Sequence, residues 1–135
     1  MFRYEQPILF KHCDPAGIVF YPRYFEMMND CVEDFFAEVL RWPFSEIHTS
    51  AAVPTAEIRT RFIAPSRLGD QLTLVLRVSL VGRTSCGLTL DAGCSGEQRF
   101  ATELTLVHVN EMGKPAKWPE VVNTRLATFK ESQEP

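Results

Sequence analysis

The chain has 135 residues, of which 45% are hydrophobic and 23% charged, and its formal net charge is −3. This length predicts a single domain over residues 1–135 that buries its own hydrophobic core. The acidic balance and the lack of a lysine or arginine cluster argue against nucleic-acid binding. No apolar run approaches the roughly 20 residues of a membrane span, and the first residues do not resemble a secretory signal. We therefore expect a cytoplasmic protein that binds no membrane.

The cysteines predict reduced thiols. Cys13, Cys31, Cys86 and Cys94 form no Cys-x-x-Cys pair, and no histidine stands at the spacing of a zinc site. We therefore expect neither a bound metal nor redox chemistry.

The first half of the chain predicts a strand followed by a long helix. Alternating side chains place residues 2–10 in the strand, and apolar residues at spacings of three and four predict a helix over residues 22–40. Pro22 suits the first turn of that helix. Because its apolar arc is wide, we expect the helix to be largely buried. Residues 43–53 show no period and predict a loop with at most one helical turn.

The second half predicts four strands. Apolar and polar side chains alternate over residues 53–62, 72–80, 86–92 and 100–108, with turns around Gly82 and Gly96. These spacings are typical of an antiparallel meander. The tail from Glu111 is polar and predicts a short helix after Pro119.

The order of these elements predicts the fold class. An antiparallel sheet of about five strands needs a cover for its apolar face, and only the helix over residues 22–40 is long and apolar enough. The sequence therefore predicts an α+β fold in which the sheet wraps around one long central helix.

A tight turn, Asp14-Pro15-Ala16-Gly17, joins the first strand to the helix. Asp at the first position, Pro at the second and Gly at the fourth are typical of a type I β-turn, which is a purely structural explanation. The same turn places a carboxylate beside a helix start, where unpaired N–H groups and a partial positive charge can stabilise an oxyanion. The second interpretation predicts catalysis at an acyl carbonyl, and local chemistry leaves both open.

Residues 14–24, DPAGIVFYPRY, closely resemble the active-site motif of the 4-hydroxybenzoyl-CoA thioesterase family of hot-dog proteins. The later stretches 65–70, 82–85 and 113–119 are also similar to that family. The resemblance implies a hot-dog fold and the hydrolysis of an acyl-CoA to free acid and coenzyme A. It implies that Asp14 is the catalytic carboxylate, and that the backbone N–H of Tyr21 polarises the thioester carbonyl.

The resemblance also implies the ligand contacts and the assembly. It implies a substrate pocket with Gly17, Tyr24, Phe25 and Asn29, between the subunits of a homodimer or homotetramer. Asn29 stands where the 4-hydroxybenzoyl enzymes are expected to carry a carboxylate, so the acyl group remains open. Coenzyme A is part of the substrate, and no separate cofactor is expected.

The coenzyme A contacts are predicted from the resemblance to this family and from the chemistry of phosphate binding. Arg83, Ser85 and Lys114 are the expected contacts, because phosphates are bound by a few positive and hydroxyl groups.

Several alternatives remain for the mechanism. Asp14 either attacks the carbonyl to form a mixed anhydride or acts as a general base for water. His12 is a second candidate base, for which a structural role is favoured, and Cys13 is a thiol without a paired histidine. The helix acids Glu26, Asp30, Glu33 and Asp34 are expected to be solvated or at a subunit interface.

Two other functions compete with hydrolysis. The first is a hot-dog module that binds acyl-CoA without cleaving it, which the intact Asp14 motif disfavours. The second is an acyl-thioester hydratase or dehydratase, which is disfavoured because the helix contains no histidine.

Overall fold

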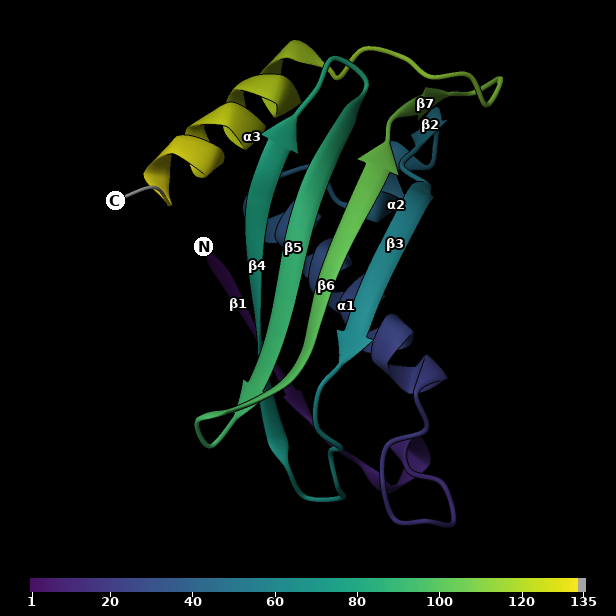
Figure 1. Ribbon diagram of the computed structural model, residues 1–135. Helices are drawn as coiled ribbons and strands as arrows, with labels where there is room; N and C mark the ends of the chain where they lie inside the picture. Colours follow the sequence, from purple (N-terminus) through teal and green to yellow (C-terminus); the bar gives the residue numbers. More distant parts are fainter. Residues whose placement is uncertain (134–135) are drawn as a thin grey trace.

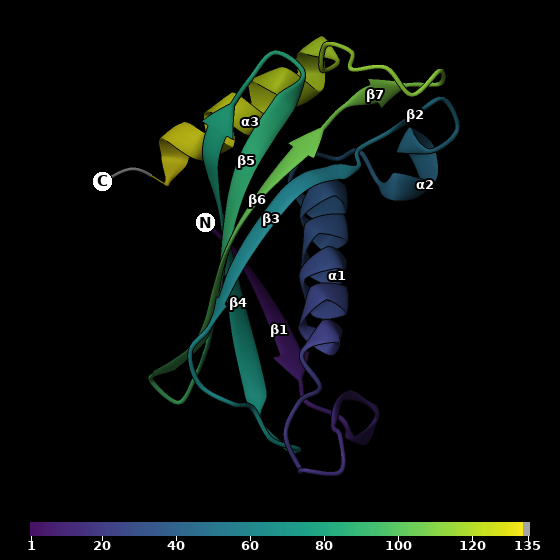
Figure 2. The same cartoon turned by 45° about the vertical axis from the view of Figure 1, so that its right-hand side comes forward.

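The structure is a computed structural model that describes residues 1–133. The elements in chain order are β1 (Phe2–Pro7), the 3-10 helix η1 (Phe10–His12), α1 (Pro22–Glu38), α2 (Phe44–Ile47), β2 (Ala51–Ala52), β3 (Thr55–Phe62), β4 (Gln71–Val81), β5 (Ser85–Cys94), β6 (Glu97–Val107), β7 (Val109–Asn110) and α3 (Glu120–Ser132). Figure 2 shows α1 running along one face of the sheet. The predicted α+β class, a five-stranded antiparallel sheet with a helix packed on it, is confirmed.

The five strands lie in the order β1-β4-β5-β6-β3, and every neighbouring pair is antiparallel (Figure 1). Strands β4, β5 and β6 form the predicted meander. The meander prediction is wrong for β3, which pairs with β6 instead of β4. Residues 63–70 cross from β3, at one edge of the sheet, to β4, which lies next to β1 at the other edge. A second sheet of β2 and β7 was not predicted, since strands of two residues are too short to show a period.

Helix α1 begins at Pro22 as predicted and ends at Glu38, two residues before the predicted end. It stops because Arg41 adopts a left-handed φ of 53°, after which the Trp42 N–H donates to the Phe36 carbonyl oxygen at 2.9 Å. The buried face of α1 contains Tyr24, Met27, Met28, Cys31, Val32, Phe35 and Phe36. This wide apolar face confirms the predicted burial of the helix.

Helix α3 is longer than the short helix expected after Pro119. It has 13 residues, and its side chains Val122 and Leu126 are buried. The ring of Phe129 lies 5.1 Å from that of Phe35, so α3 packs near the C-terminal half of α1 and beside β4 (Figure 1).

Two features are absent from residues 1–133. No helix in this range is long and apolar enough to cross a membrane. No group of three His, Cys, Asp or Glu side chains in the same range is arranged to hold a metal ion. The four cysteines are free thiols.

Candidate active site

The predicted β-turn at Asp14 is present. The Gly17 N–H donates to the Asp14 carbonyl oxygen at 2.9 Å, and Gly17 has a φ of 83° that favours glycine. The Ala16 N–H donates to Asp14 Oδ1 at 2.9 Å. Within residues 1–133, no hydrogen bond reaches Asp14 Oδ2. Asp14 is half-buried, and its carboxylate is held through Oδ1 while Oδ2 has no hydrogen-bond partner among these residues.

The backbone N–H at the start of α1 is unused. The Phe20 N–H donates to the His12 carbonyl oxygen at 2.9 Å, and the Tyr24 N–H donates to the Tyr21 carbonyl oxygen at 3.1 Å. Tyr21 is the N-cap, and in the described part of the chain its own N–H donates to no acceptor. An unpaired N–H at a helix start, where the helix dipole is positive, suits a developing oxyanion.

His12 has a structural role in the folded chain. Its Nδ1 accepts the Leu9 N–H at 2.9 Å, and its carbonyl oxygen accepts the Phe20 N–H. Burial lowers the pKa of His12, and the nearby Lys11 and Arg23 lower it further. These contacts favour the structural explanation that the sequence had already favoured over a general base.

The other alternative residues are engaged or exposed. The Cys13 thiol lies 3.7 Å from the Leu9 carbonyl oxygen. On α1, Glu26 forms an exposed ion pair with Arg23 at 3.1 Å, and Asp30 is exposed. The exposed positions of Glu26 and Asp30 agree with the expectation that the helix acids are solvated.

Two of the four predicted substrate contacts line one cavity. It has a volume of about 450 Å³ and lies between α1, α2 and the strands β3 and β6. Phe25 and Asn29 line it, together with Met28, Val32, Phe44, His48, Ala52, Val53, Pro54, Thr55, Ile58, Leu104 and Leu106. Tyr24 is buried instead, with its ring 5.7 Å from Phe62 and 5.1 Å from Phe100. Gly17 stays in the turn, away from this cavity.

His48 was missed by the sequence analysis although it lines the same cavity. Its Nδ1 lies 2.8 Å from the Phe44 carbonyl oxygen, and its ring meets the Phe44 ring edge-on. No signal could have found it, because residues 43–53 lack a period that would orient their side chains.

The predicted coenzyme A contacts are not all brought together. Arg83 borders a cavity of about 630 Å³ with Lys117 and Trp118. The Ser85 carbonyl oxygen accepts the Trp118 indole N–H at 3.0 Å, so Ser85 lies next to this region. Lys114 lies outside the lining, in a turn where its N–H donates to Asn110 Oδ1 at 3.1 Å. The sequence analysis missed Lys117.

Comparison with known proteins assigns the family. The sequence model of the thioesterase-like superfamily matches residues 8–126. The chain belongs to this superfamily, and membership supports hydrolysis of a thioester. Among curated proteins, none matches the sequence.

Solved structures are similar over almost the whole chain and share the hot-dog fold. A gentisyl-coenzyme A thioesterase is 25% identical, with a TM-score of 0.85 over 93% of this chain and 99% of that chain. A 1,4-dihydroxy-2-naphthoyl-CoA thioesterase from Synechocystis is 18% identical, with a TM-score of 0.86 over 93% and 95%. A protein from Staphylococcus aureus, solved in complex with CoA, is 19% identical, with a TM-score of 0.93 over 99% and 86%.

Proposed function

We propose that this protein is an acyl-CoA thioesterase that uses Asp14 and the Tyr21 N–H. The observation that carries the proposal is the unused Tyr21 donor at the start of α1, seven residues after a carboxylate with a free oxygen. Membership in the thioesterase-like superfamily supports the same reaction. Asp14, Pro15 and Gly17 also build the β-turn, so the structural and catalytic explanations of the motif are compatible.

The mechanism begins with the thioester carbonyl oxygen accepting the Tyr21 N–H. In one route, Asp14 attacks the carbonyl carbon, the coenzyme A thiolate leaves, and water hydrolyses the mixed anhydride to regenerate the carboxylate. In the other, Asp14 takes a proton from water as the water attacks, and the proton passes to the leaving thiolate. In both routes the N–H stabilises the charge that develops on the carbonyl oxygen.

The acyl group would occupy the cavity that contains Phe25 and Asn29. Apolar side chains with a few polar groups are typical of a small-molecule site. Arg83 and Ser85 would contact the coenzyme A phosphates or pantetheine, and Lys117 is better placed than Lys114 to act with Arg83. The complex of the Staphylococcus aureus protein with CoA supports such a ligand.

We propose a homodimer or homotetramer with the site between subunits. Strand β3 is a free edge of the sheet, and its residues are exposed on both faces. Ile58 and Phe62 are 43% and 49% exposed. A second copy of the chain would cover this edge, and Ile58 also borders the acyl cavity.

Thiol release from short aliphatic, long aliphatic and aromatic acyl-CoAs tests the proposal. We expect wild-type protein to release thiol, and Asp14→Asn to lose at least about a hundredfold in kcat. Asp30→Asn, an exposed acid of α1, is the matched control and should keep wild-type activity. If wild-type protein binds acyl-CoA but leaves it intact, the result would instead favour a module that binds acyl-CoA without cleaving it. A change in enoyl-CoA absorbance without thiol release would favour a hydratase.

The oxyanion donor can be tested by removing its hydrogen. Tyr21 has a φ of −53°, which proline can adopt, so Tyr21→Pro deletes the N–H and Tyr21→Ala retains it. We expect the proline variant to lose about a hundredfold to a thousandfold in kcat and the alanine variant far less. Equal kcat values for two variants with wild-type circular dichroism would exclude this donor.

A further inference from the structure

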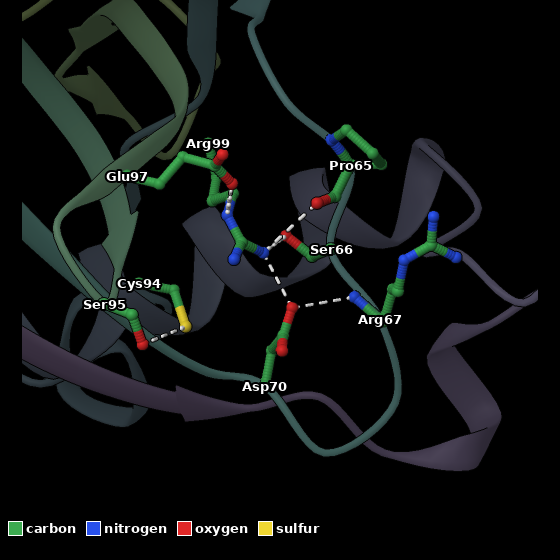
Figure 3. Close-up of polar contacts among 8 residues, drawn as sticks. All are labelled: Pro65, Ser66, Arg67, Asp70, Cys94, Ser95, Glu97 and Arg99. Carbon is green, nitrogen blue, oxygen red and sulfur yellow. Dashed lines mark hydrogen bonds and ion pairs between the residues drawn. The ribbon is translucent and has the colours of Figure 1, made fainter.

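A charged side chain is buried where the chain crosses the end of the sheet. Arg99 of β6 is 9% exposed. As Figure 3 shows, its Nη1 donates to Asp70 Oδ2 at 2.7 Å, Ser66 Oγ at 3.1 Å and the Pro65 carbonyl oxygen at 3.2 Å. Its Nε lies 2.8 Å from Glu97 Oε1, in an ion pair rather than an aligned hydrogen bond. We call Pro65, Ser66, Asp70, Glu97 and Arg99 the Arg99 cluster.

The Arg99 cluster holds both members of its central ion pair in the charged form. The hydrogen bond from Arg99 lowers the pKa of Asp70, and the same bond raises the pKa of Arg99. A buried guanidinium requires such partners, because desolvation of an unpaired charge is costly. Three of the four partners of Arg99 belong to the segment 63–70. The Arg99 carbonyl oxygen also accepts the N–H groups of Ile63 and Ala64 at 2.9 and 3.2 Å.

The same segment supports the loop between Asp14 and Tyr21. The Val19 N–H donates to the carbonyl oxygen of Ser66 at 2.9 Å, and Ile18 forms an antiparallel bridge with Arg67. Ser66 is fully buried, so its position is fixed by the packing around it. The Arg67 N–H in turn donates to Asp70 Oδ2, the oxygen that Arg99 binds. Ser66 therefore links the two parts: its hydroxyl binds Arg99, and its carbonyl oxygen binds the loop that contains the proposed site.

We propose that Arg99 is a positioning residue of this site. Resting on the proposed function, the inference is that Arg99 fixes segment 63–70 and thereby the relative placement of Asp14 and the Tyr21 N–H. It touches neither the acyl group nor coenzyme A. The β4–β5 turn with Arg83 lies at the opposite end of the sheet (Figure 1), so loss of Arg99 should leave coenzyme A binding intact. The expected signature is a fall in kcat with little change in KM.

The test compares Arg99→Gln and Arg99→Lys with wild type. We expect Arg99→Gln to lower kcat roughly tenfold to a hundredfold, because small misplacements of reacting groups have effects of this size. KM should change less than about threefold, since the ligand contacts remain. Arg99→Lys keeps a positive charge beside Asp70 but cannot contact all of the oxygen atoms that the guanidinium binds. It should therefore recover only part of kcat. Arg3→Gln is the control, because Arg3 is an exposed arginine of β1, at the opposite edge of the sheet from β3, and should show wild-type kcat.

Hydrogen exchange of the Val19 amide gives a readout that does not depend on activity. We expect this amide to exchange about tenfold faster in Arg99→Gln than in wild type, as the loss of one charged hydrogen bond permits. If Arg99→Gln does not fold, Asp70→Asn tests the same link. A lower melting temperature with unchanged Val19 exchange and unchanged kcat would make Arg99 merely structural and overturn the proposal.

The two proposals can fail separately. If wild-type protein releases no thiol from any acyl-CoA, the proposed function fails, and Val19 exchange still decides whether Arg99 holds the loop. If thiol is released and Arg99→Gln leaves kcat and exchange unchanged, only the positioning role fails.

Discussion

His12 joins two segments around the proposed site through one side chain and one backbone oxygen. Its Nδ1 accepts the Leu9 N–H, which requires the proton of the neutral ring to lie on Nε2. Its carbonyl oxygen accepts the Phe20 N–H next to Tyr21. Protonation of Nδ1 would remove the first of these bonds, in a place where burial already disfavours a charged ring.

This predicts a pH dependence of folding stability. Because burial lowers the pKa of folded His12 below its usual 6.5, the unfolded chain binds a proton first as pH falls. The contribution of His12 should be complete above about pH 6.5 and should decrease as pH falls toward the lowered pKa, with a slope of at most about 1.4 kcal/mol per pH unit. Urea unfolding from pH 5 to 8 measures how the free energy of unfolding depends on pH. His12→Asn should make this dependence weaker. An identical slope in both proteins would contradict it.

At the scale of residues, the sequence predicted features that depend only on neighbouring residues in the chain. The Asp14 turn, with Gly17 at positive φ, follows from the preferences of its four residues. Lys117 and His48 were missed because their cavities are formed by segments far apart in the chain. Arg99 was missed for the same reason, since its partners come from residues 63–70, and it lay just outside the predicted strand, which began at residue 100 although β6 begins at Glu97.

At the scale of elements, α3 shows how a helix can protect the edge of a strand. Strand β1 pairs with β4 only as far as Leu76, which leaves Val78 without a partner on that edge. The Gln133 side chain takes that place: its Oε1 accepts the Val78 N–H at 3.2 Å, and its Nε2 donates to the Val78 carbonyl oxygen. One amide therefore satisfies both backbone groups as a neighbouring strand would.

Removal of this amide should weaken the fold. We expect Gln133→Ala to lower the free energy of unfolding by about 1–3 kcal/mol, because two hydrogen bonds to a half-buried backbone are lost. Gln98→Ala, at an exposed position in β6, is the control and should change it by less than about 0.5 kcal/mol. Equal urea midpoints for the two variants would refute a role for Gln133.

Element types were predictable where the side-chain period was long enough. Strands β4, β5 and β6 and helix α1 agree with the predicted residues to within a few positions at their ends. The neighbour of β3 was not predictable, because a period of two indicates which face of a strand is buried and not which strand lies beside it. The length of α3 was underestimated because only Val122, Leu126 and Phe129 mark its inner face, within a tail that is otherwise mostly polar.

For the whole molecule, the exposed β3 edge carries the prediction of assembly. We expect sedimentation equilibrium to give at least a dimer for wild type and a lighter species for Ile58→Lys, because a buried lysine at a packed edge would be unpaired. Val121→Lys, at an exposed position of α3, should keep the wild-type mass. A monomeric wild type would rule out the proposed site between subunits.

The strand order β1-β4-β5-β6-β3 also has a consequence for the path by which the chain folds. Strands β4, β5 and β6 are joined by short turns, so their pairing closes small loops, whereas Phe2 meets Leu76 and Phe62 meets Phe100 across long stretches of chain. Closing long loops costs more entropy and slows folding. We therefore expect the three-stranded centre to form first, and the two outer strands, with the Asp14 loop between them, to be the last to acquire native contacts.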